Sequence, residues 1–376
     1  MKIALIIPTM DRGGAEKQVV LLACGLHQRG HDVRVLLLTR DGPRSETLRR
    51  HGVIVEVIGK RFKGDVTALW RLRRSLHEFQ PDVVHTFLFA ANSFGRLAAV
   101  MAEVPVVMAS ERCIDVWKQS WQFWIDRRLQ SVSHAITTNS IGVVDFLIEH
   151  GIEQDKIKII HNGIDPVRCG DGDARDVISR ADAAAQLNVD PSRVWLVAVG
   201  RLWPQKRVRD LIWAAELLGT LRENTTLIVI GDGPQRDELL RHRDAVSRVD
   251  YTRFVGWRDN VRALLPHAAA FWLASSEEGQ SNALIEAMQM GVPVIASDIP
   301  GNRELIDDGK TGWLFPLGDE AALARVTNMI LDDPETSQRV ASAAQQRINA
   351  EFSVDEMVGR HVDLYVSALQ RSGETS

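Results

Sequence analysis

The chain has 376 residues with 45% apolar and 25% charged side chains, which is the composition of a globular protein too long for one core, so two domains are expected. No apolar run reaches the ~18 residues of a membrane-spanning helix, and the three cysteines have neither a CxxC pair nor zinc-finger spacing, as expected of free thiols in a reducing cytoplasm. The formal net charge is −4, but residues 1–165 carry 22 Lys+Arg against 18 Asp+Glu and the remainder 23 against 31, an imbalance that argues against general nucleic-acid binding.

The first half of the chain alternates short apolar strands with amphipathic helices. Strands are predicted at 2–8, 31–38, 53–58, 82–87, 104–110 and 134–140, and helices at 15–30 and Val66–Phe79. Continuously apolar strands separated by helices predict an α/β fold with a doubly wound parallel sheet.

The same pattern restarts after a segment rich in Gly, Asp and Pro. Strands are predicted at 194–200, 226–231, 251–256, 269–275 and 292–297, and a helix at 208–221. We expect a first Rossmann-like domain over 1–166, a linker over 167–176 and a second domain over 177–353. Ligands of such sheets bind beyond the carboxyl ends of the strands, so the cleft between the domains is the expected site.

The stretch SEEGQSNALIE, from Ser276 to Glu286, contains two carboxylates separated by a loop that turns into a helix. Asn282 is the predicted N-cap, and the N–H groups at that helix end favour an anion. Glu278 and Glu286 are up to about 12 Å apart if the segment is helical, too far to share a proton or a metal ion. They suit the two ends of a long ligand with an anionic middle, such as a nucleotide-diphosphate sugar.

Two cations follow the first strand of the second half. Arg201 comes directly after that strand, and Lys206 stands just before the next helix. Arg as a fork and Lys as a point charge suit a diphosphate, although a solvated basic loop would have the same residues. Gly13 and Gly14, after the first strand of the chain, either let backbone approach a ligand or form a tight turn.

Other phosphate and metal motifs are absent or poorly placed. GDGP (231–234) has Arg236 where a dinucleotide fingerprint needs a third small residue, and no P-loop motif occurs. Asp171-Gly-Asp173 has the form of a metal-binding pair but stands in the predicted linker, so we interpret it as a solvated loop. We therefore expect neither a metal nor a cofactor.

Seven motifs occur in an order that resembles the retaining GT-B glycosyltransferases of family 4, over nearly the whole chain. They are GGAEK (13–17), HNGID (161–165), VGRLWPQK (199–206), GDGP (231–234), VGWRDN (255–260), SEEGQSNALIEAMQMGVPVIASD (276–298) and NRELI (302–306). The resemblance implies two Rossmann-like domains, with a last helix at about 354–370 crossing back onto the first. It further implies a hexosyltransferase that works without a metal ion and without a protein nucleophile.

The resemblance also implies roles for individual residues. Arg201 and Lys206 would bind the donor diphosphate and, with Glu278, form the catalytic group. Glu286 would bind the ribose hydroxyls, the backbone around Arg258 the base, and Gly14 would add a contact from the first domain. The remaining expected donor contacts are the loop and helix-end residues Gly279, Gln280, Ser281, Asn282, Ala283 and Leu284.

The chain departs from the family pattern in the first domain. Many members of the family have a histidine after the strand that ends here at Ala109, but this chain has Ser110-Glu111-Arg112 at that place. Either Arg112 or His85 would then contact the sugar or acceptor, or the donor is unusual. Gln280 replaces the family's aromatic residue, which makes the expected sugar pocket more polar.

Two surface patterns of the first half allow different interpretations. Trp117, Trp121 and Trp124, beside Lys118, Arg127 and Arg128, predict either a helix that meets anionic lipid or ordinary packing in the core or domain cleft. A basic run, with the members Lys60, Arg61, Lys63, Arg71, Arg73 and Arg74, is either a solvated face or a lipid-binding patch.

The sequence therefore predicts a cytoplasmic retaining glycosyltransferase, peripheral on the membrane if its acceptor is lipid-linked. Its partners would be a nucleotide-sugar donor, a saccharide or lipid-linked saccharide acceptor and an anionic membrane, with no nucleic acid. The alternatives are a catalytically silent sugar-nucleotide-binding protein and another nucleotide-sugar enzyme on this fold, such as an epimerase.

Overall fold

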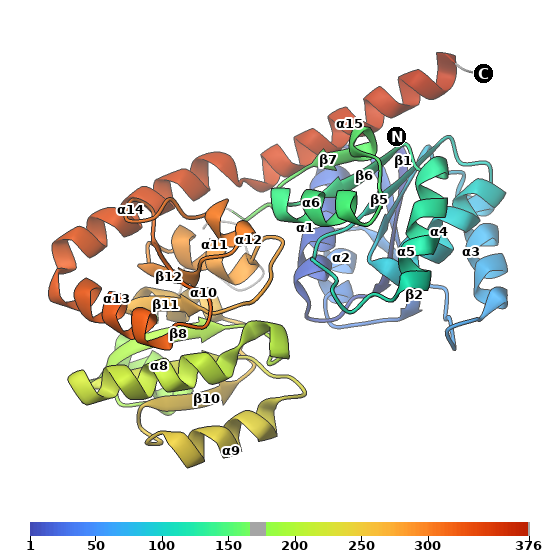
Figure 1. The fold of residues 1–376 in the computed structure, drawn as a ribbon. Coiled ribbons are helices and arrows are strands. Elements are labelled where there is room, and N and C mark those ends of the chain that lie inside the picture. Colours follow the sequence, from blue (N-terminus) through green and yellow to red (C-terminus); the bar gives the residue numbers. More distant parts are fainter. Residues whose placement is uncertain (166–177, 375–376) are drawn as a thin grey trace. The chain divides into compact units, whose positions relative to one another are not determined.

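The computed structural model describes residues 1–165 and 178–374, which form two compact units (Figure 1). Unit 1 contains Met1–Gly163 and the segment that begins at Phe352, and unit 2 is Ile164–Glu351. The predicted linker at 167–176, with Asp171 and Asp173, lies outside the described residues. None of the described helices has the length and apolar character that crossing a membrane requires.

Unit 1 contains a parallel sheet with the strand order β3-β2-β1-β4-β5-β6-β7. The strands are β1 (Lys2–Thr9), β2 (Asp32–Arg40), β3 (Ile54–Val57), β4 (Val83–Phe87), β5 (Val106–Ser110), β6 (Ala135–Thr138) and β7 (Ile157–Ile159). The first strand pairs with β2 on one side and β4 on the other, so the order reverses beside β1. The carboxyl ends around such a reversal are where ligands of open α/β sheets bind.

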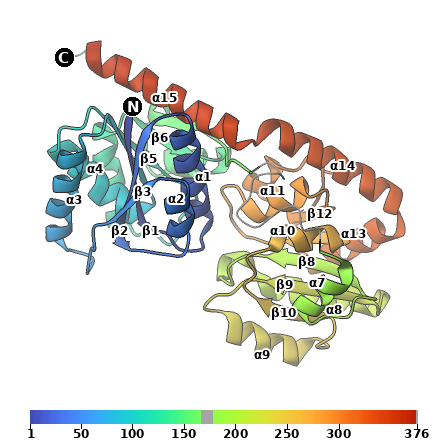
Figure 2. The ribbon, with the colours of Figure 1, turned by 180° about the vertical axis from the view of Figure 1, so that it is seen from behind.

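Helices cover both faces of this sheet (Figures 1 and 2). They are α1 (Gly14–Gln28), α2 (Ser45–Arg50), α3 (Val66–Phe79), α4 (Phe89–Met101), α5 (Ser120–Leu129), α6 (Ile141–Glu149) and α15 (Val354–Glu374), with 3-10 turns η1 (Gln130–Val132) and η2 (Gln154–Lys156). Alternate β1 side chains serve the two faces: Leu5 joins a core cluster with α1 and α15, and Ile6 one with α3 and α4. Helix α15 also contacts β5.

Unit 2 contains a parallel sheet with the order β10-β9-β8-β11-β12-β13. Its strands are β8 (Val194–Val199), β9 (Thr225–Ile230), β10 (Thr252–Gly256), β11 (Ala270–Leu273), β12 (Val294–Ser297) and β13 (Trp313–Phe315). Its helices are α7 (Arg180–Leu187), α8 (Val208–Leu221), α9 (Arg236–Val246), α10 (Val261–Leu264), α11 (Asn282–Gln289), α12 (Pro300–Arg303), α13 (Glu320–Asp332) and α14 (Pro334–Glu351), with η3 (Pro204–Lys206) and η4 (Leu265–His267). The predicted α/β architecture of two Rossmann-like parallel-sheet units is confirmed.

Candidate functional site

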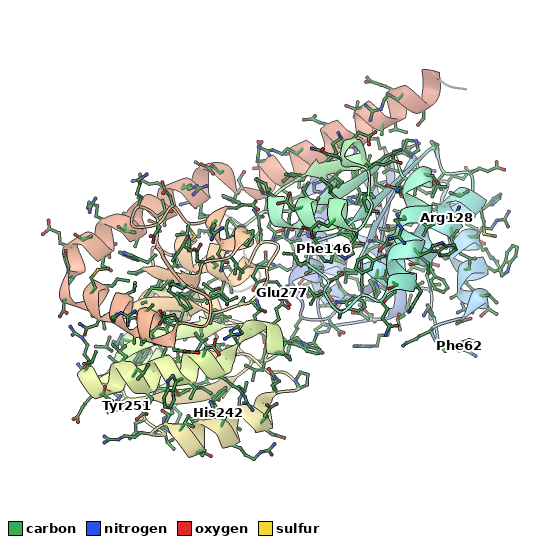
Figure 3. The ribbon with its side chains drawn as sticks, in the orientation of Figure 1. Phe62, Arg128, Phe146, His242, Tyr251 and Glu277 are labelled. Carbon is green, nitrogen blue, oxygen red and sulfur yellow. The ribbon has the colours of Figure 1, made fainter. Side chains whose placement is uncertain are left out.

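The loops after β8 and β11 meet at the carboxyl edge of the unit 2 sheet, because these two strands are neighbours. The backbone N–H of Ser276 donates to the carbonyl of Gln205 at 2.9 Å, and the Gln205 side chain donates to the carbonyl of Glu277 at 2.6 Å. Glu277 is labelled in Figure 3. The structure thus brings together the Arg201–Lys206 loop and the Glu278 loop, which are more than seventy residues apart in the chain.

Lys206 and Glu278 contact each other directly in this edge. The Lys206 ammonium forms an ion pair with Glu278 Oε1, which also accepts a hydrogen bond of 2.7 Å from Ser275 Oγ. Glu278 is 7% exposed, so its charge depends on these partners. An ammonium has several N–H donors, so Lys206 has the capacity to hold Glu278 and a phosphate oxygen together.

Arg201 lies on the outer side of the same loop. It is exposed, and its guanidinium stacks over the Trp203 ring, 4.6 Å from the ring centre. Within residues 1–165 and 178–374, no carboxylate lies in ion-pair distance of this group. A pocket at the end of β8 is lined by Gly200, Arg201 and Lys206 together with apolar residues of β8, β9, α8 and β11. The pocket itself is small and mainly apolar, so the feature of this edge that suits an anion is the presence of two cations, of which Lys206 is already paired with Glu278.

Two glycines permit the close backbone packing that fixes these loops. Gly231 has a φ of +140°, and a Cβ there would lie 1.9 Å from the carbonyl oxygen of Gly200. A Cβ at Gly301, in α12, would lie 2.5 Å from the carbonyl oxygens of both Glu278 and Gly279. The GDGP motif thus supports the Arg201 loop by packing, and Gly301 supports the Glu278 loop.

Sequence reasoning missed a chain of hydrogen bonds behind Glu278. Asn302 Nδ2 donates to the carbonyl of Ser297 at 2.8 Å, and Ser297 Oγ donates to the carbonyl of Ser275 at 2.6 Å. All three residues are buried. Asn302 belongs to the NRELI motif, and the position of this motif after a strand was the sequence feature that could have indicated a role at the site. The sequence does not show which groups the Asn302 amide contacts.

Helix α11 begins at the end of the Glu278 loop. Its N-cap is Ser281, whose hydroxyl accepts from the backbone N–H of Leu284, so the prediction of Asn282 as N-cap was wrong by one residue. Gly279, Gln280, Ser281 and Leu284 are buried, whereas Asn282, Ala283 and Glu286 are half-buried. The helix end places a positive partial charge next to Glu278 in the chain, which favours an anion there.

The other two predicted donor contacts lie on separate elements. Arg258 follows β10 and donates to the carbonyls of Trp257 at 2.9 Å and Gln186 at 3.3 Å. Its side chain thus links the loop after β10 to the backbone of α7. Gly14, in unit 1, is the exposed first residue of α1, with Gly13 as its N-cap.

His85 lies in the core of unit 1, not on its surface. It is 0% exposed, its Nδ1 is 2.7 Å from the Tyr365 hydroxyl, and its Nε2 is 3.1 Å from Thr137 Oγ1. Burial, followed by the neighbouring His361 and Arg112, holds the pKa of His85 well below its usual value. Of the two alternatives for a sugar or acceptor contact, Arg112 and His85, the structure argues against His85, because both ring nitrogens have partners within the core.

The tryptophans of the α5 region are exposed: 60% for Trp117 and 53% for both Trp121 and Trp124. They are therefore not core residues. Arg128 and Phe62, labelled in Figure 3, also lie on the surface of unit 1.

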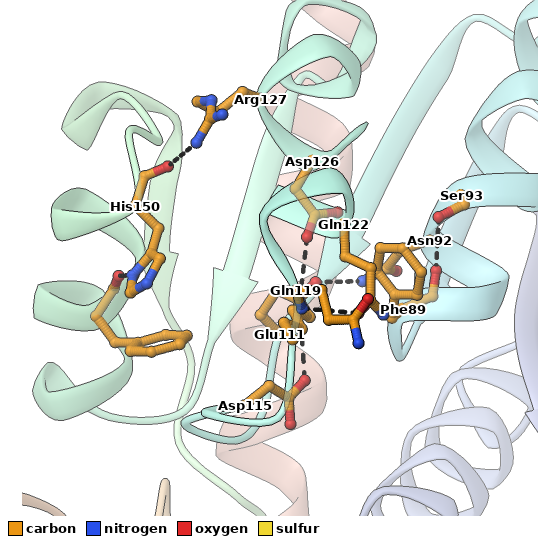
Figure 4. Close-up of polar contacts among 12 residues, drawn as sticks. Phe89, Asn92, Ser93, Glu111, Asp115, Gln119, Gln122, Asp126, Arg127 and His150 are labelled. Carbon is orange, nitrogen blue, oxygen red and sulfur yellow. Dashed lines mark hydrogen bonds and ion pairs between the residues drawn. The ribbon is translucent and has the colours of Figure 1, made fainter. Parts of the chain in front are cut away.

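Lys118 does not belong to that surface. It is 7% exposed, and its ammonium lies 3.1 Å from Glu111 Oε2 and 3.1 Å from Asp126 Oδ2. Both acidic residues are labelled in Figure 4. Of the two interpretations left open for this stretch, packing within the unit therefore holds for Lys118 and the lipid-facing one does not. Arg71 and Arg73 of the basic run likewise donate to backbone carbonyls of unit 1.

No group of three or more His, Cys, Asp or Glu side chains in the described parts of the chain is arranged to hold a metal ion. Asp171 and Asp173 are outside those parts.

Family models match both units. Residues 12–168 match the model described as Glycosyltransferase Family 4, and residues 193–333 match the model described as Glycosyl transferases group 1.

Relatives and solved structures match over most of the chain. Lipopolysaccharide core biosynthesis glycosyltransferase LpsD of Rhizobium meliloti is 28% identical over 354 residues, covering 94% of this chain and 95% of that protein. UDP-Gal:alpha-D-GlcNAc-diphosphoundecaprenol alpha-1,3-galactosyltransferase of Escherichia coli is 25% identical, covering 80% of this chain and 79% of that protein. Anabaena Alr3699/HepE in complex with UDP superposes with a TM-score of 0.83 at 23% identity, covering 98% of this chain and 100% of that one.

Proposed function

Because the chain belongs to the group 1 glycosyltransferases of family 4, with the GT-B fold, we propose that it transfers a hexosyl group from a nucleotide-diphosphate sugar with retention of anomeric configuration. The acceptor is a saccharide or lipid-linked saccharide of a cell-surface polysaccharide or glycolipid. The observation that carries this proposal is the convergence of Arg201, the Lys206–Glu278 pair and the α11 N-terminus at one sheet edge. The name of LpsD and the UDP bound by HepE support it.

In the proposed reaction, Arg201 and Lys206 bind the donor diphosphate and stabilise the negative charge that develops on the leaving nucleotide. An acceptor hydroxyl oxygen bonds to the anomeric carbon on the face from which the β-phosphate oxygen departs. The bond between that carbon and the β-phosphate oxygen breaks, and the hydroxyl proton passes to a β-phosphate oxygen. No protein nucleophile takes part in this scheme.

The remaining candidate residues bind the donor. Glu278 and the amides of Gly279, Gln280, Ser281 and Asn282 hold the sugar hydroxyls, and those near Asn282, Ala283 and Leu284 add to the diphosphate site. Glu286 binds the ribose hydroxyls, the backbone around Arg258 the base edge, and Gly14 is a further donor contact.

A direct test offers the protein uridine, guanosine and thymidine diphosphate sugars, first by thermal shift and then by turnover. We expect slow hydrolysis of the matching donor, with NMR showing retained anomeric configuration in the released sugar. Binding without any turnover would favour the catalytically silent alternative. Interconversion of the donor sugar without its release would favour an epimerase.

Activity should persist in excess chelator, because in the proposed reaction Arg201, Lys206 and the α11 N-terminus supply the positive charge that neutralises the diphosphate. The measurement is donor turnover with and without EDTA. Loss of turnover that magnesium restores would contradict this prediction and make Asp171 and Asp173 candidate ligands.

We also propose that unit 1 rests on an anionic membrane when the acceptor is lipid-linked. Helices α3, α4 and α5 follow one another in contact. Exposed apolar side chains on and beside them include Phe62, Val66, Trp70, Val116, Trp117, Trp121 and Trp124. The exposed cations Arg61 and Lys63 flank Phe62, and such a mixture of apolar and basic side chains suits the interface of an anionic bilayer.

Binding to vesicles should be weak, should need anionic lipid and should be released by salt, at about 1 kcal/mol for each cation near the surface. Co-sedimentation would compare the wild type with a variant that has Lys60, Arg61 and Lys63 changed to Ser. Changing the exposed Lys310 and Arg325 of unit 2 to Ser provides the matched control. Equal binding to neutral and anionic vesicles would rule out electrostatic docking.

A further inference from the structure

Arg112 follows the last residue of β5 and is a buried cation without an acidic partner. It is 6% exposed, and its Nη2 donates to Asn162 Oδ1. No carboxylate among residues 1–165 and 178–374 pairs with it. Burial lowers the pKa of the guanidinium to about 10, so it remains charged at neutral pH. Buried charges are normally paired, which makes this arrangement unusual.

The adjacent acid does not neutralise Arg112. Glu111 Oε1 accepts from Asn92 Nδ2 at 2.9 Å, and Glu111 Oε2 lies 3.1 Å from the Lys118 ammonium. Successive side chains of an extended segment point to opposite sides, so Glu111 belongs to the α4–α5 side of the loop. The charge of Arg112 is therefore left for another group.

The groups near Arg112 are neutral polar side chains from several elements: Asn139 follows β6, Asn162 follows β7, His85 lies in β4 and His361 in α15. Asn162 Oδ1 also accepts from Asn139 Nδ2 at 3.2 Å, and Arg112 acts electrostatically on His85 and His361. Among the described residues, Ser110 Oγ, Asn139 Oδ1 and His361 Nε2 are buried without a hydrogen-bond partner. Unpaired buried polar atoms next to an unpaired cation indicate a polar site whose set of partners is incomplete.

We infer that Arg112 binds a carboxylate or phosphate group carried by the sugar substrate, so that the enzyme acts on an acidic saccharide. This inference rests on the proposed function and names its substrate class. A planar guanidinium holds such a group through parallel N–H donors, and a neutral sugar hydroxyl would leave its charge unpaired. The acidic group belongs either to the donor sugar or to the acceptor, and the two sources are separable by experiment.

The donor arm compares acidic and neutral donors on one nucleotide. The probes are UDP-glucuronate with UDP-glucose, and GDP-mannuronate with GDP-mannose, titrated into wild type, Arg112→Gln and Arg112→Lys. For an acidic donor we expect the wild type to prefer the uronate about 100-fold, as for one buried charged contact, and Arg112→Gln to abolish that preference. Arg112→Lys keeps the positive charge but not the planar pair of donors, so it should keep part of the preference for the uronate. This variant also provides a test if Arg112→Gln folds poorly. Arg128→Gln, at an exposed arginine of α5, is the matched control.

The acceptor arm adds free glucuronate, glucose 6-phosphate or glucose to the nucleotide-saturated enzyme and follows binding by ligand-observed NMR. Binding of the acidic sugars that requires Arg112, without a donor preference, assigns the acidic group to the acceptor. Normal nucleotide binding with no Arg112-dependent preference in either arm overturns the inference alone. So does an Arg112→Gln variant that weakens UDP as much as UDP-glucuronate, because Arg112 would then bind the diphosphate. Absence of nucleotide binding by the wild type overturns the proposed function and the inference with it.

Discussion

Replacing Arg201 with Ala should lower kcat by about 100-fold or more, because its guanidinium would stabilise charge that develops only as the nucleotide leaves. The side chain is exposed and has a cation–π contact with Trp203 as its described interaction. The substitution should therefore leave the unfolding temperature nearly unchanged. Steady-state kinetics with the matching donor measures the effect, and Arg209→Ala, at an exposed arginine paired with Glu238, serves as control with less than about a twofold change expected.

Lys206→Ala should have a similar effect on kcat but a different effect on stability. The Glu278 carboxylate is 7% exposed, and its two side-chain partners in the described part of the chain are Lys206 and Ser275. Removal of the lysine leaves it with the Ser275 hydroxyl alone. Unlike Arg201→Ala, this variant should therefore unfold at a lower temperature. A near-normal kcat with a raised donor KM in both variants would show that the two cations provide uniform binding and no catalysis.

Much of the fold could be predicted because a long amphipathic helix shows its first and last residues by where its periodic apolar pattern begins and stops. Helices α3 and α8 begin and end at the residues that the sequence predicts. At α3 the reason is local, since the Asp65 carboxylate accepts from the backbone N–H groups of Thr67 and Ala68. Strands β7 and β13 have three residues each, too short to show a period, and they were missed.

The candidate site was predictable in its residue types but not in its contacts. Motif order placed Arg201, Lys206 and Glu278 in one site, and the structure brings their loops together. The hydrogen bond of Glu278 with Ser275 and its ion pair with Lys206 depend on the packing of the loop backbones, which the sequence alone does not define.

The structure decides between alternatives that the sequence left open at two positions. His85 was one of two alternatives for a sugar or acceptor contact, and Lys118 belonged to a stretch that predicted either a lipid-facing helix or packing. Tertiary packing buries both side chains. Sequence spacing does not show which polar side chains find partners inside the protein.

Lys118 is the centre of a buried charge cluster that ties the β5–α5 loop to its neighbours. Figure 4 labels the acidic members of this cluster, Glu111, Asp115 and Asp126. Its ammonium contacts Glu111 and Asp126 at 3.1 Å each and Asp115 at 3.8 Å. A second buried cation, Arg96 of α4, pairs with Asp126 at 3.0 Å. The cluster therefore has three carboxylates and two cations, so the removal of one cation raises its excess of negative charge from one to two.

Lys118→Met should destabilise unit 1 by about 3–5 kcal/mol at neutral pH, the usual cost of removing one partner from a buried ion pair. For a unit of this size, that corresponds to a fall of roughly 10 °C in Tm. Thermal unfolding followed by circular dichroism measures the change. Lys310→Met is the matched control, since Lys310 pairs with Asp307 on the surface with its side chain 75% exposed.

The stability that Lys118→Met loses should be smaller at acidic pH than at neutral pH. Burial, and then the neighbouring Glu111, raises the pKa of Asp115 to about 6, and burial also raises the pKa of Asp126. A carboxyl group whose pKa is raised by folding contributes stability below its ordinary pKa, and that contribution is lost as the pH rises through the folded value. Without Lys118 these pKa values should rise further, so the variant should recover part of its stability between about pH 7 and pH 5 while the control stays unaffected. An equal loss at both pH values would mean that Lys118 stabilises the loop by packing alone.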